Sequence, residues 1–207
     1  MTGWLVVALL AVSIASLAWG ASEASVFTVL GKLWRGEELS AVERVVMVNI
    51  RMPRLFMGML VGAGLAVSGA ILQGLFRNPL ADPGIVGVTA GGSLGAISAI
   101  VLGSLLPAGV LAVTSGWLVA LAAFFGAWIS TLLLYRVATR DGRTSVATML
   151  LAGIALAALA AAISGLLVFR ASDAQLRDLT FWSMGSLAGA TWSRVLAALP
   201  IVALALT

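Results

Sequence analysis

Apolar residues occur in long runs along this chain, and short polar segments separate them. The runs cover approximately residues 3–21, 55–76, 84–106, 116–135, 144–169 and 195–207. A membrane-crossing helix needs about 20 predominantly apolar residues, and most of these runs are near that length. The pattern therefore predicts an all-α, multi-spanning membrane protein, with residues 1–207 forming a single transmembrane domain.

Two boundaries of the predicted spans do not follow from the apolar runs alone. Residues 84–135 carry no charge and are too many for one crossing, and Pro107, Gly109 and the cluster at 114–116 indicate a turn between two spans. The last run contains roughly 13 residues, which are too few to cross a bilayer. We therefore expect the chain to be the front part of a longer protein, truncated at the C-terminus within an incomplete span.

The first apolar run has two interpretations. It is followed by Ala21-Ser22-Glu23-Ala24, which resembles the cleavage site of a signal peptide. No basic residue precedes the run, although signal peptides begin with a basic region. We expect a retained helix, with a signal peptide as the alternative.

The outer loop at 22–54 is the longest polar region. One helical face of it collects apolar side chains, as in an interfacial helix: Val26, Phe27, Leu30, Leu33 and Trp34. Ser40 and Glu43 have the spacing of a capping box, which predicts a second short helix at about 41–50. These helices either cover helix ends or dock a partner, and the two roles are compatible.

Composition excludes several classes of protein. The chain is 61% hydrophobic and 10% charged, whereas soluble domains average roughly 25% charged residues. It contains no Cys and no His, so disulfides, thiolate catalysis, Cys-based metal sites and histidine chemistry are excluded, and we expect no metal site. The net charge of +4 is spread over loops without a basic stripe, and we expect no nucleic-acid partner.

No Asp, Glu, Lys, Arg or His lies inside any predicted span. Ion-coupled transporters and intramembrane enzymes keep ionisable groups at depth, so this argues against both classes. By elimination, a solute carrier of this kind would take its energy from an attached ATPase. An ion-coupled secondary transporter or channel stays as the alternative, and a structural membrane subunit is a third.

The spans are instead rich in small residues. Glycine and serine recur in the second and third spans at Gly58, Gly62, Gly64, Ser68, Gly69, Gly74, Gly84, Gly87, Gly91, Gly92 and Gly95. In lipid, small residues let helix backbones approach closely, so we expect tight helix packing. The fifth span, at 152–165, either packs in this way or lines a wide, chemically bland pathway.

Several motifs follow one another from Arg51 to Leu187. They are RMPR at 51–54, GAGLA at 62–66, SGA at 68–70, QGLFRNPLADPG at 73–84, GVTAG at 87–91 and FWSMGSL at 181–187. In this order they resemble the permease family of type II ABC importers, which take up iron–siderophores, haem and vitamin B12, and they look most similar to the haem-type permeases. The resemblance covers most of the chain.

The resemblance implies a helical fold with ten spans, of which about six would lie here. It implies a homodimer with a pathway along its interface, two cytoplasmic ATPase subunits that carry ATP and Mg²⁺, and an extracytoplasmic substrate-binding protein. The chain itself would be a transport subunit with no cofactor, not an enzyme, in the lipid bilayer of the bacterial inner membrane with a cytoplasmic N-terminus. The implied cargo is haem first, ferric siderophore second and cobalamin third.

Charge alone indicates the opposite orientation. With a cytoplasmic N-terminus, the outer loops hold Lys32, Arg35, Arg44, Arg51, Arg54, Arg170, Arg177 and Arg194. The inner loops hold only Arg77, Arg136, Arg140 and Arg143. The positive-inside rule favours the reverse assignment. We follow the resemblance, because its motifs are specific and the rule is statistical.

Arginines supply the candidate binding residues. Arg51 and Arg54 are three apart and can share a helical face; by the resemblance they face acidic residues of the binding protein, and the alternative is that they reach lipid headgroups. In a haem importer Arg177, and less directly Arg170, would meet a propionate; the alternative is an interfacial anchor. Met149 and Met184 could offer soft contacts to a planar ligand, or simply fill gaps.

A polar turn follows the second span. Asn78, Pro79, Asp82 and Pro83 predict a rigid turn, because Pro ends helices while Asn and Asp bond to the local backbone. Asp82 and Arg77 could form a local ion pair. We expect a structural turn in a cytoplasmic loop, with flexing against the ATPase as the alternative.

Overall fold

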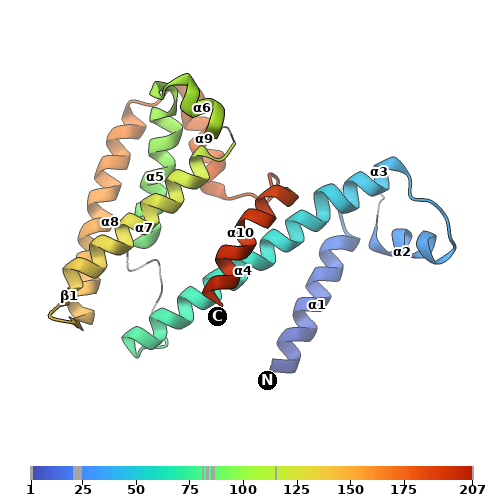
Figure 1. The fold of residues 1–207 in the computed structure, drawn as a ribbon, viewed down its shortest axis with the longest axis horizontal. Coiled ribbons are helices and arrows are strands. Elements are labelled where there is room, and N and C mark those ends of the chain that lie inside the picture. Colours follow the sequence, from blue (N-terminus) through green and yellow to red (C-terminus); the bar gives the residue numbers. More distant parts are fainter. Residues whose placement is uncertain are drawn as a thin grey trace. The chain divides into compact units, whose positions relative to one another are not determined.

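The computed structural model describes residues 2–20, 25–80, 82, 84, 87–114 and 116–206. Most of these residues are helical (Figure 1), in the order α1 (Thr2–Ala18), α2 (Val26–Trp34), α3 (Ala41–Arg44), the π-helical η1 (Val45–Arg51), α4 (Met52–Phe76), α5 (Val88–Leu102), the 3₁₀ turn η3 (Gly103–Leu105), α6 (Ala108–Thr114), α7 (Leu118–Ala138), α8 (Val146–Phe169), α9 (Asp173–Met184) and α10 (Trp192–Ala205). The predicted all-helical fold is confirmed.

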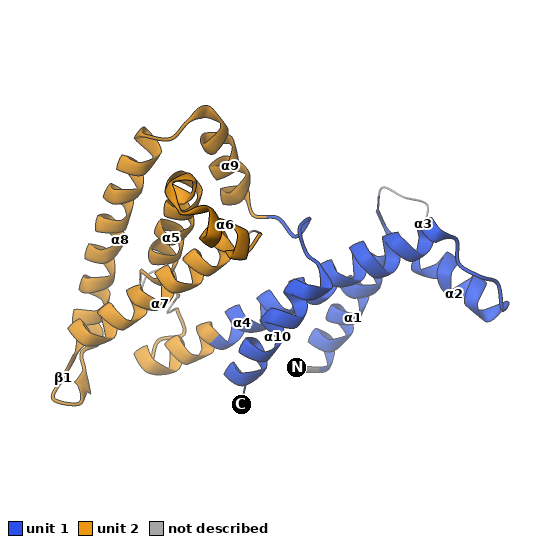
Figure 2. Ribbon diagram, turned by 45° about the horizontal axis from the view of Figure 1, so that its top comes forward, with its two compact units in different colours: residues 1–67, 186–207 blue, residues 68–185 orange. Residues whose placement is uncertain are grey.

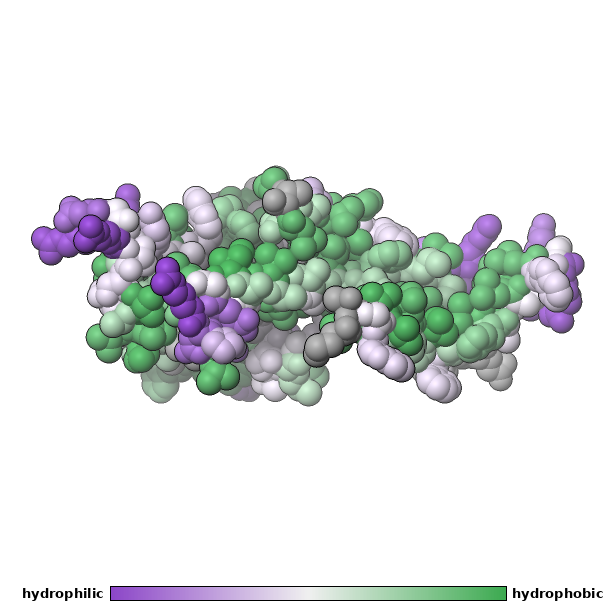
Figure 3. All heavy atoms as spheres, turned by 90° about the horizontal axis from the view of Figure 1, so that it is seen from below, coloured by the Kyte–Doolittle hydropathy of each residue, from purple (hydrophilic) through white to green (hydrophobic). Residues whose placement is uncertain are grey.

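Four helices of the described part are long and apolar enough to cross a membrane. They are Ala41–Phe76, Val88–Leu105, Leu118–Ala138 and Val146–Phe169. The apolar helices Gly3–Ala18 and Trp192–Ala205 are shorter. Hydrophobic residues cover most of the face shown in Figure 3, and hydrophilic residues gather in a few clusters. This distribution is typical of a protein whose solvent is largely lipid.

A small hairpin interrupts the helices between α7 and α8. Strand β1 (Thr139–Arg140) pairs antiparallel with β2 (Arg143–Thr144), and Thr139 lies opposite Thr144. Asp141 and Gly142, between the strands, have φ angles of 51° and 73°. Positive φ at both central residues is the requirement of a type I′ hairpin turn, which Asp-Gly favours.

The chain divides into two compact units, coloured separately in Figure 2. The first consists of residues 1–67 and 186–207, and the second of residues 68–185. The first unit therefore contains α1, α2, α3, η1, most of α4 and α10. The second contains the end of α4 and all elements from α5 to α9. We describe each unit by itself.

In the second unit, α5 and α7 cross in direct backbone contact. A Cβ atom added to Gly91 would lie 2.6 Å from the carbonyl oxygen of Gly126, and one added to Gly95 would overlap the carbonyl of Ala122. The expected close packing is confirmed here. In α4 the glycines make no such backbone contact in the described part of the chain: an added Cβ would meet nothing within 4 Å at Gly62, Gly69 and Gly74, and only side chains at 3.5 and 4.0 Å at Gly58 and Gly64.

The first turn of α5 is fixed by its two neighbours. Gly87 precedes the helix with a φ of 81°, and a Cβ there would lie 2.9 Å from the carbonyl oxygen of Gly153 in α8. The buried Ser130 hydroxyl of α7 donates a hydrogen bond of 3.1 Å to the carbonyl oxygen of Gly87. The helix therefore begins at Val88, four residues after the start of the apolar run.

The second unit has a hydrophobic cluster at the ends of α7 and α8. Leu134, Ala138 and Met149 are buried in it. Partly buried side chains from α4, α5 and α8 pack around them: Leu72, Phe76, Val88, Ala152 and Leu156. Ser145 caps the N-terminus of α8 by accepting from the backbone N–H of Thr148. The cluster holds α7 and α8 together beside the hairpin.

In the first unit, α3, η1 and α4 form one continuous helix. The short helix predicted to end near Ile50 does not end there. Pro53 would clash with the carbonyl four residues before it in an α-helix, and it has no N–H to donate. The helix widens instead: the N–H of Met52 bonds to the carbonyl of Met47, five residues earlier. The π-helical register lets the helix continue through Pro53.

The missing donor of Pro53 is replaced from α10. The next bond in the π register would run from residue 53 to the carbonyl oxygen of Val48, and proline cannot form it. The indole Nε1 of Trp192 donates a hydrogen bond of 2.8 Å to that oxygen. The Trp192 ring also lies 5.5 Å from the ring of Phe56. Trp192 therefore fastens the start of α10 to the α3–η1–α4 helix.

An ion pair joins α2 to α3. The predicted capping box is confirmed, since Ser40 accepts from the N–H of Glu43 at 3.2 Å and donates its own N–H to Glu43 Oε2 at 2.9 Å. Lys32 Nζ donates to both carboxylate oxygens of Glu43, at 2.7 and 2.9 Å. The hydrogen bonds from Lys32, and then those from Ser40, lower the pKa of Glu43 to about 2. Glu43 lies outside the uncharged segment 55–76, which is the part of this helix that is predicted to cross the membrane.

Candidate functional site

Arg51 is buried at the end of η1. Its side chain is 8% exposed, and its Nη1 donates to the carbonyl oxygen of Leu17 in the last turn of α1. A Cβ atom on Gly20 would lie 2.9 Å from Arg51 Cζ, so the guanidinium needs the space that glycine leaves. Carbonyls at a helix C-terminus lack partners within the helix, and a cation stabilises them. Arg51 thus caps α1.

The buried position of Arg51 differs from the one that docking of a substrate-binding protein requires. A residue that contacts a binding protein must present its charge at the surface, and the Arg51 guanidinium is turned into the unit. Arg54 is exposed, one turn further along α4, and its Nη2 lies 3.5 Å from the carbonyl oxygen of Ala188. Both arginines border a hollow of about 440 Å³, together with Trp19 and Ile50. Of the two predicted docking residues, Arg54 is the accessible one.

The polar turn after α4 is stabilised by its own side chains. Asn78 Oδ1 accepts from the backbone N–H of Leu80 at 2.9 Å, and Asp82 Oδ1 accepts from that of Gly84 at 2.5 Å. These are local turns of the kind that Asn and Asp favour. Pro79 lies between them, and Pro83 lies outside the described residues.

The suggested pair of Arg77 and Asp82 is not among the ion pairs of the described residues. The Asp82 carboxylate instead accepts the backbone hydrogen bond from Gly84. Arg77 itself has a φ of 49° and ends α4. The turn is therefore held by side chain–backbone bonds and not by an ion pair.

Three of the four residues predicted to meet a substrate lie in or near α9. Arg170 follows α8 and Arg177 lies within α9; both are exposed. Met184, at the end of α9, is 75% exposed. Met149 is 7% exposed and packs in the hydrophobic cluster with Leu134 and Ala138. The structure brings Arg177 and Met184 onto one helix but places Met149 among packed side chains.

Gln175 positions α9, a role that was not predicted from the sequence. Its Oε1 accepts from the N–H of Ser172, completing a capping box at the start of α9. Its Nε2 donates to the carbonyl oxygens of Ile100 and Val101 at 3.3 and 3.0 Å, in the last turn of α5. One amide therefore caps two helices. The Ser-x-x-Gln spacing could have indicated the first role.

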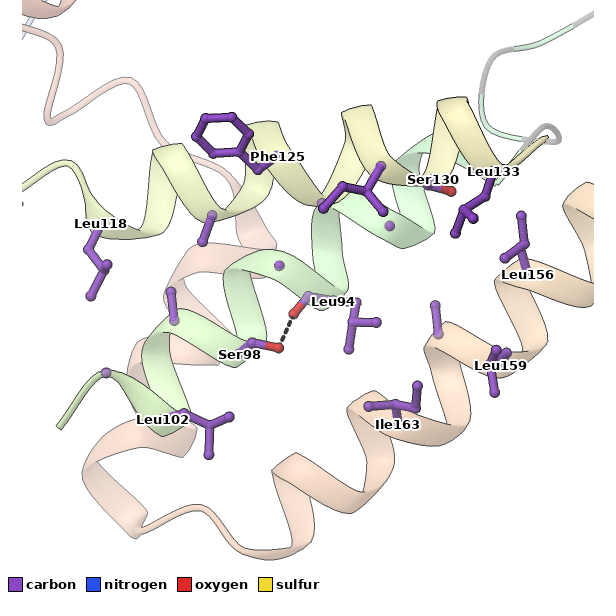
Figure 4. A pocket seen from close by; sticks show the side chains of 18 of the residues that line it. Leu94, Ser98, Leu102, Leu118, Phe125, Ser130, Leu133, Leu156, Leu159 and Ile163 are labelled. Atoms are coloured by element: carbon purple, nitrogen blue, oxygen red, sulfur yellow. Dashed lines mark hydrogen bonds between the residues drawn. The ribbon is translucent and has the colours of Figure 1, made fainter. Parts of the chain in front are cut away.

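An apolar cavity of about 580 Å³ lies among α5, α7 and α8. Figure 4 shows Leu94 and Ser98 of α5, Phe125 of α7, and Leu159 and Ile163 of α8 around it. Its two hydroxyls are already bonded to backbone carbonyls: Ser98 to Leu94 at 2.7 Å, and Ser130 to Gly87 at 3.1 Å. The cavity can hold apolar groups, and its lining offers no acid, base or nucleophile for chemistry.

The described residues also contain no cluster of three or more acidic residues that could hold a metal ion. What the structure offers is a set of apolar helices, surface arginines and a polar turn. The described part presents no catalytic constellation.

Comparisons with known proteins agree with this picture. The sequence profile of the FecCD transport family matches residues 8–207. The cobalamin import system permease protein BtuC of Halobacterium salinarum is 45% identical over 159 residues, which are 77% of this chain and 40% of that protein. The hemin transport system permease protein HmuU of Yersinia pestis is 39% identical over 202 residues, 98% of this chain and 58% of that protein.

A solved structure has the same fold. It is an ABC transporter assigned to the metal-chelate type, in an inward-facing conformation, with a TM-score of 0.73 and 29% identity; the match covers 93% of this chain and 55% of that chain. The chain spans about half the length of the relatives it matches. Because cobalamin and hemin permeases match at similar identity, the expected closeness to haem-type permeases is not supported. The chain belongs to the FecCD transport family, the permeases of type II ABC importers.

Proposed function

We propose that the chain forms part of the membrane permease of an ATP-driven importer for a metal chelate. The match of the FecCD profile to residues 8–207 carries this proposal. In this account two such permeases form a homodimer with the pathway between them. Two cytoplasmic ATPase subunits hold ATP and Mg²⁺, and an extracytoplasmic binding protein delivers the cargo. The permease lies in the bacterial inner membrane with its N-terminus in the cytoplasm.

The chemistry of the helices supports an external energy source. The apolar segments at 55–76, 88–102, 118–135 and 146–169, which belong to α4, α5, α7 and α8, contain no Asp, Glu, Lys, Arg or His. Ion-coupled transporters keep such groups at depth, where a charge is costly unless it is used. The two hydroxyls at the apolar cavity among α5, α7 and α8 already donate to backbone carbonyls. ATP hydrolysis on partner subunits therefore fits this chain better than coupling through its own membrane helices.

The cargo is proposed as a class. Cobalamin and haem are the first candidates, because the relatives are named for cobalamin and hemin import. Both are large metal-centred macrocycles that carry polar edges. A ferric siderophore is the third candidate and rests on the family resemblance alone. The uptake experiment described below tests which of haem and cobalamin is the cargo.

Exposed side chains supply the proposed contacts with cargo and partner. Arg177, with Arg170 behind it, can pair with a carboxylate at the cargo edge, because guanidinium binds carboxylate through two parallel hydrogen bonds. Met184 at 75% exposure can contact an apolar face of the cargo. Arg54 would face an acid of the binding protein. Met149 would first have to leave the hydrophobic cluster, so we do not include it.

Uptake into proteoliposomes tests the proposed function. The full-length permease and its ATPase would be offered cobalamin, haem and a ferric siderophore in turn, each on its binding protein, with and without ATP. ATP-dependent uptake of one cargo is expected. Uptake that collapses with a protonophore and survives without the ATPase would instead identify a secondary transporter.

Charge reversal tests the docking contact. Arg54→Glu should weaken binding of the substrate-binding protein, and more at low salt than at high salt, because rim charges are screened by ions. Arg44→Glu, on the exposed part of α3, is the matched control. Equal binding of both variants at low salt would contradict a docking role for Arg54.

A further inference from the structure

Helix α2 has an exposed apolar face. Phe27, Leu30 and Trp34 are 65%, 57% and 93% exposed. Their spacing of three and four residues places them along one side of the helix, with Leu33, 56% exposed, beside them. Moving such side chains from water into an apolar environment is favourable in proportion to the apolar area that is buried. An exposed apolar face of this kind therefore indicates a binding surface.

The other sides of α2 are already occupied. Val29 is buried, and α2 contacts α1. Lys32 points to α3, where its ammonium group is held by Glu43. Capping boxes at Ser25 and Ser40 fix the starts of α2 and α3. The apolar face is therefore kept in a fixed direction and is not a side of a freely rotating helix.

The chemistry around this face favours a bilayer surface over a protein groove. Helix α1, which precedes α2, is apolar, and its large side chains are exposed, as on a lipid-facing helix. Two tryptophans, Trp19 after α1 and Trp34 at the end of α2, are 81% and 93% exposed. Tryptophan is enriched where hydrocarbon meets headgroups. The charged pair Arg35 and Glu37 follows directly, with both side chains more than half exposed.

We propose that α2 is an interfacial helix that lies in the leaflet where α1 ends. Phe27, Leu30 and Trp34 enter the boundary between headgroups and acyl chains, while Lys32 stays on the polar side. A helix with aromatic and aliphatic side chains on one face and a cation on the other has this preference. Anchored in this way, α2 sets the depth of α3 and η1, and with them of Arg54.

Spin labels can measure the depth of this face. The 207 residues contain no cysteine, so one introduced thiol is unique among them. Leu30→Cys and Trp34→Cys would each carry a nitroxide in the full-length permease, reconstituted in vesicles of phosphatidylethanolamine and phosphatidylglycerol. Glu37→Cys, on the polar segment after α2, is the matched control. The quantities measured are collision rates with oxygen, which concentrates in acyl chains, and with a nickel chelate, which stays in water.

The expected ratio of oxygen to nickel collisions is several-fold higher at positions 30 and 34 than at position 37. Equal ratios at all three positions would overturn the proposal, since the face would then be in water. Low collision rates with both reagents at 30 and 34 would also overturn it, because a protein segment would then cover the face. Leu33→Cys reports the same face if one of the two variants fails to fold, which size-exclusion elution in detergent would reveal.

Discussion

Replacing Gly95 by alanine should force α5 and α7 apart. The added Cβ would overlap the carbonyl oxygen of Ala122 and would lie 2.8 Å from its carbonyl carbon and 3.3 Å from Ala123 Cα. Carbon atoms prefer separations of about 3.5–4.0 Å. The helices must therefore move by roughly 1 Å at this crossing, and because the obstacle is backbone, no side-chain rotation can relieve it.

Two opposing contributions decide whether Gly95→Ala lowers or raises the free energy of unfolding. Overpacking a close contact costs about 1–3 kcal/mol. Alanine is favoured over glycine within a helix by about 1 kcal/mol. Since a backbone contact places the cost in the upper part of its range, Gly95→Ala should lower the free energy of unfolding by about 1–2 kcal/mol. Gly165→Ala in α8 is the matched control, because a Cβ there meets nothing within 4 Å in the described part of the chain.

The assay is unfolding of the purified full-length permease by sodium dodecyl sulfate, followed by circular dichroism. Gly95→Ala should unfold at lower detergent fraction than the wild type, and Gly165→Ala at an equal or higher one. A Gly95→Ala protein at least as stable as the wild type would show that the backbones of α5 and α7 do not meet at this glycine. Gly126→Ala, whose Cβ would overlap the carbonyl of Gly91, should destabilise similarly.

Three further outcomes are expected. Arg51→Ala should lower the free energy of unfolding by about 2 kcal/mol, since it removes the charged hydrogen bond from the buried guanidinium to the carbonyl of Leu17 at the end of α1. Arg51→Lys should lose less, and thermal unfolding checks both. Trp192→Phe keeps an aromatic ring beside Phe56 but removes the indole N–H bond to the η1 carbonyl and part of the ring volume. It should cost at least about 1 kcal/mol in the same measurement. The stability difference between Glu43→Gln and the wild type should stay constant from pH 7 to pH 5. Because the pKa of Glu43 is lowered from its ordinary value of 4.5 to about 2, this stabilisation is lost between those two values as pH falls. A difference that shrinks above pH 5 would contradict the Lys32–Glu43 assignment.

Local patterns predicted a large part of the fold. Long uncharged runs indicated the membrane-length helices, because burying backbone in lipid requires helices over about 20 residues. Ser40 and Glu43 form the expected capping box. Gly91 and Gly95 mark a close helix crossing, as small residues in lipid do. Each of these features depends on neighbours within a few positions or on a bulk property of the solvent.

Features that depend on distant partners were not predictable. Arg51 is buried because α1 ends beside it, and the carbonyl it caps is 34 positions earlier in the chain. Trp192 reaches a carbonyl 144 positions away. Pro53 ordinarily ends a helix, yet here a wider register and that indole replace the missing bond. A sequence pattern reports the need for a partner but not which residue supplies it.

In the proposed function, solute movement is driven by ATP hydrolysis on the partner subunits and not by groups in the membrane helices of this chain. The most direct measurement is uptake of the transported cargo into proteoliposomes with ATP inside, compared between orthovanadate, which blocks the ATPase, and a protonophore, which removes the proton gradient. Orthovanadate should abolish uptake, and the protonophore should leave it unchanged. Uptake that resists orthovanadate and fails with the protonophore would contradict the proposed function.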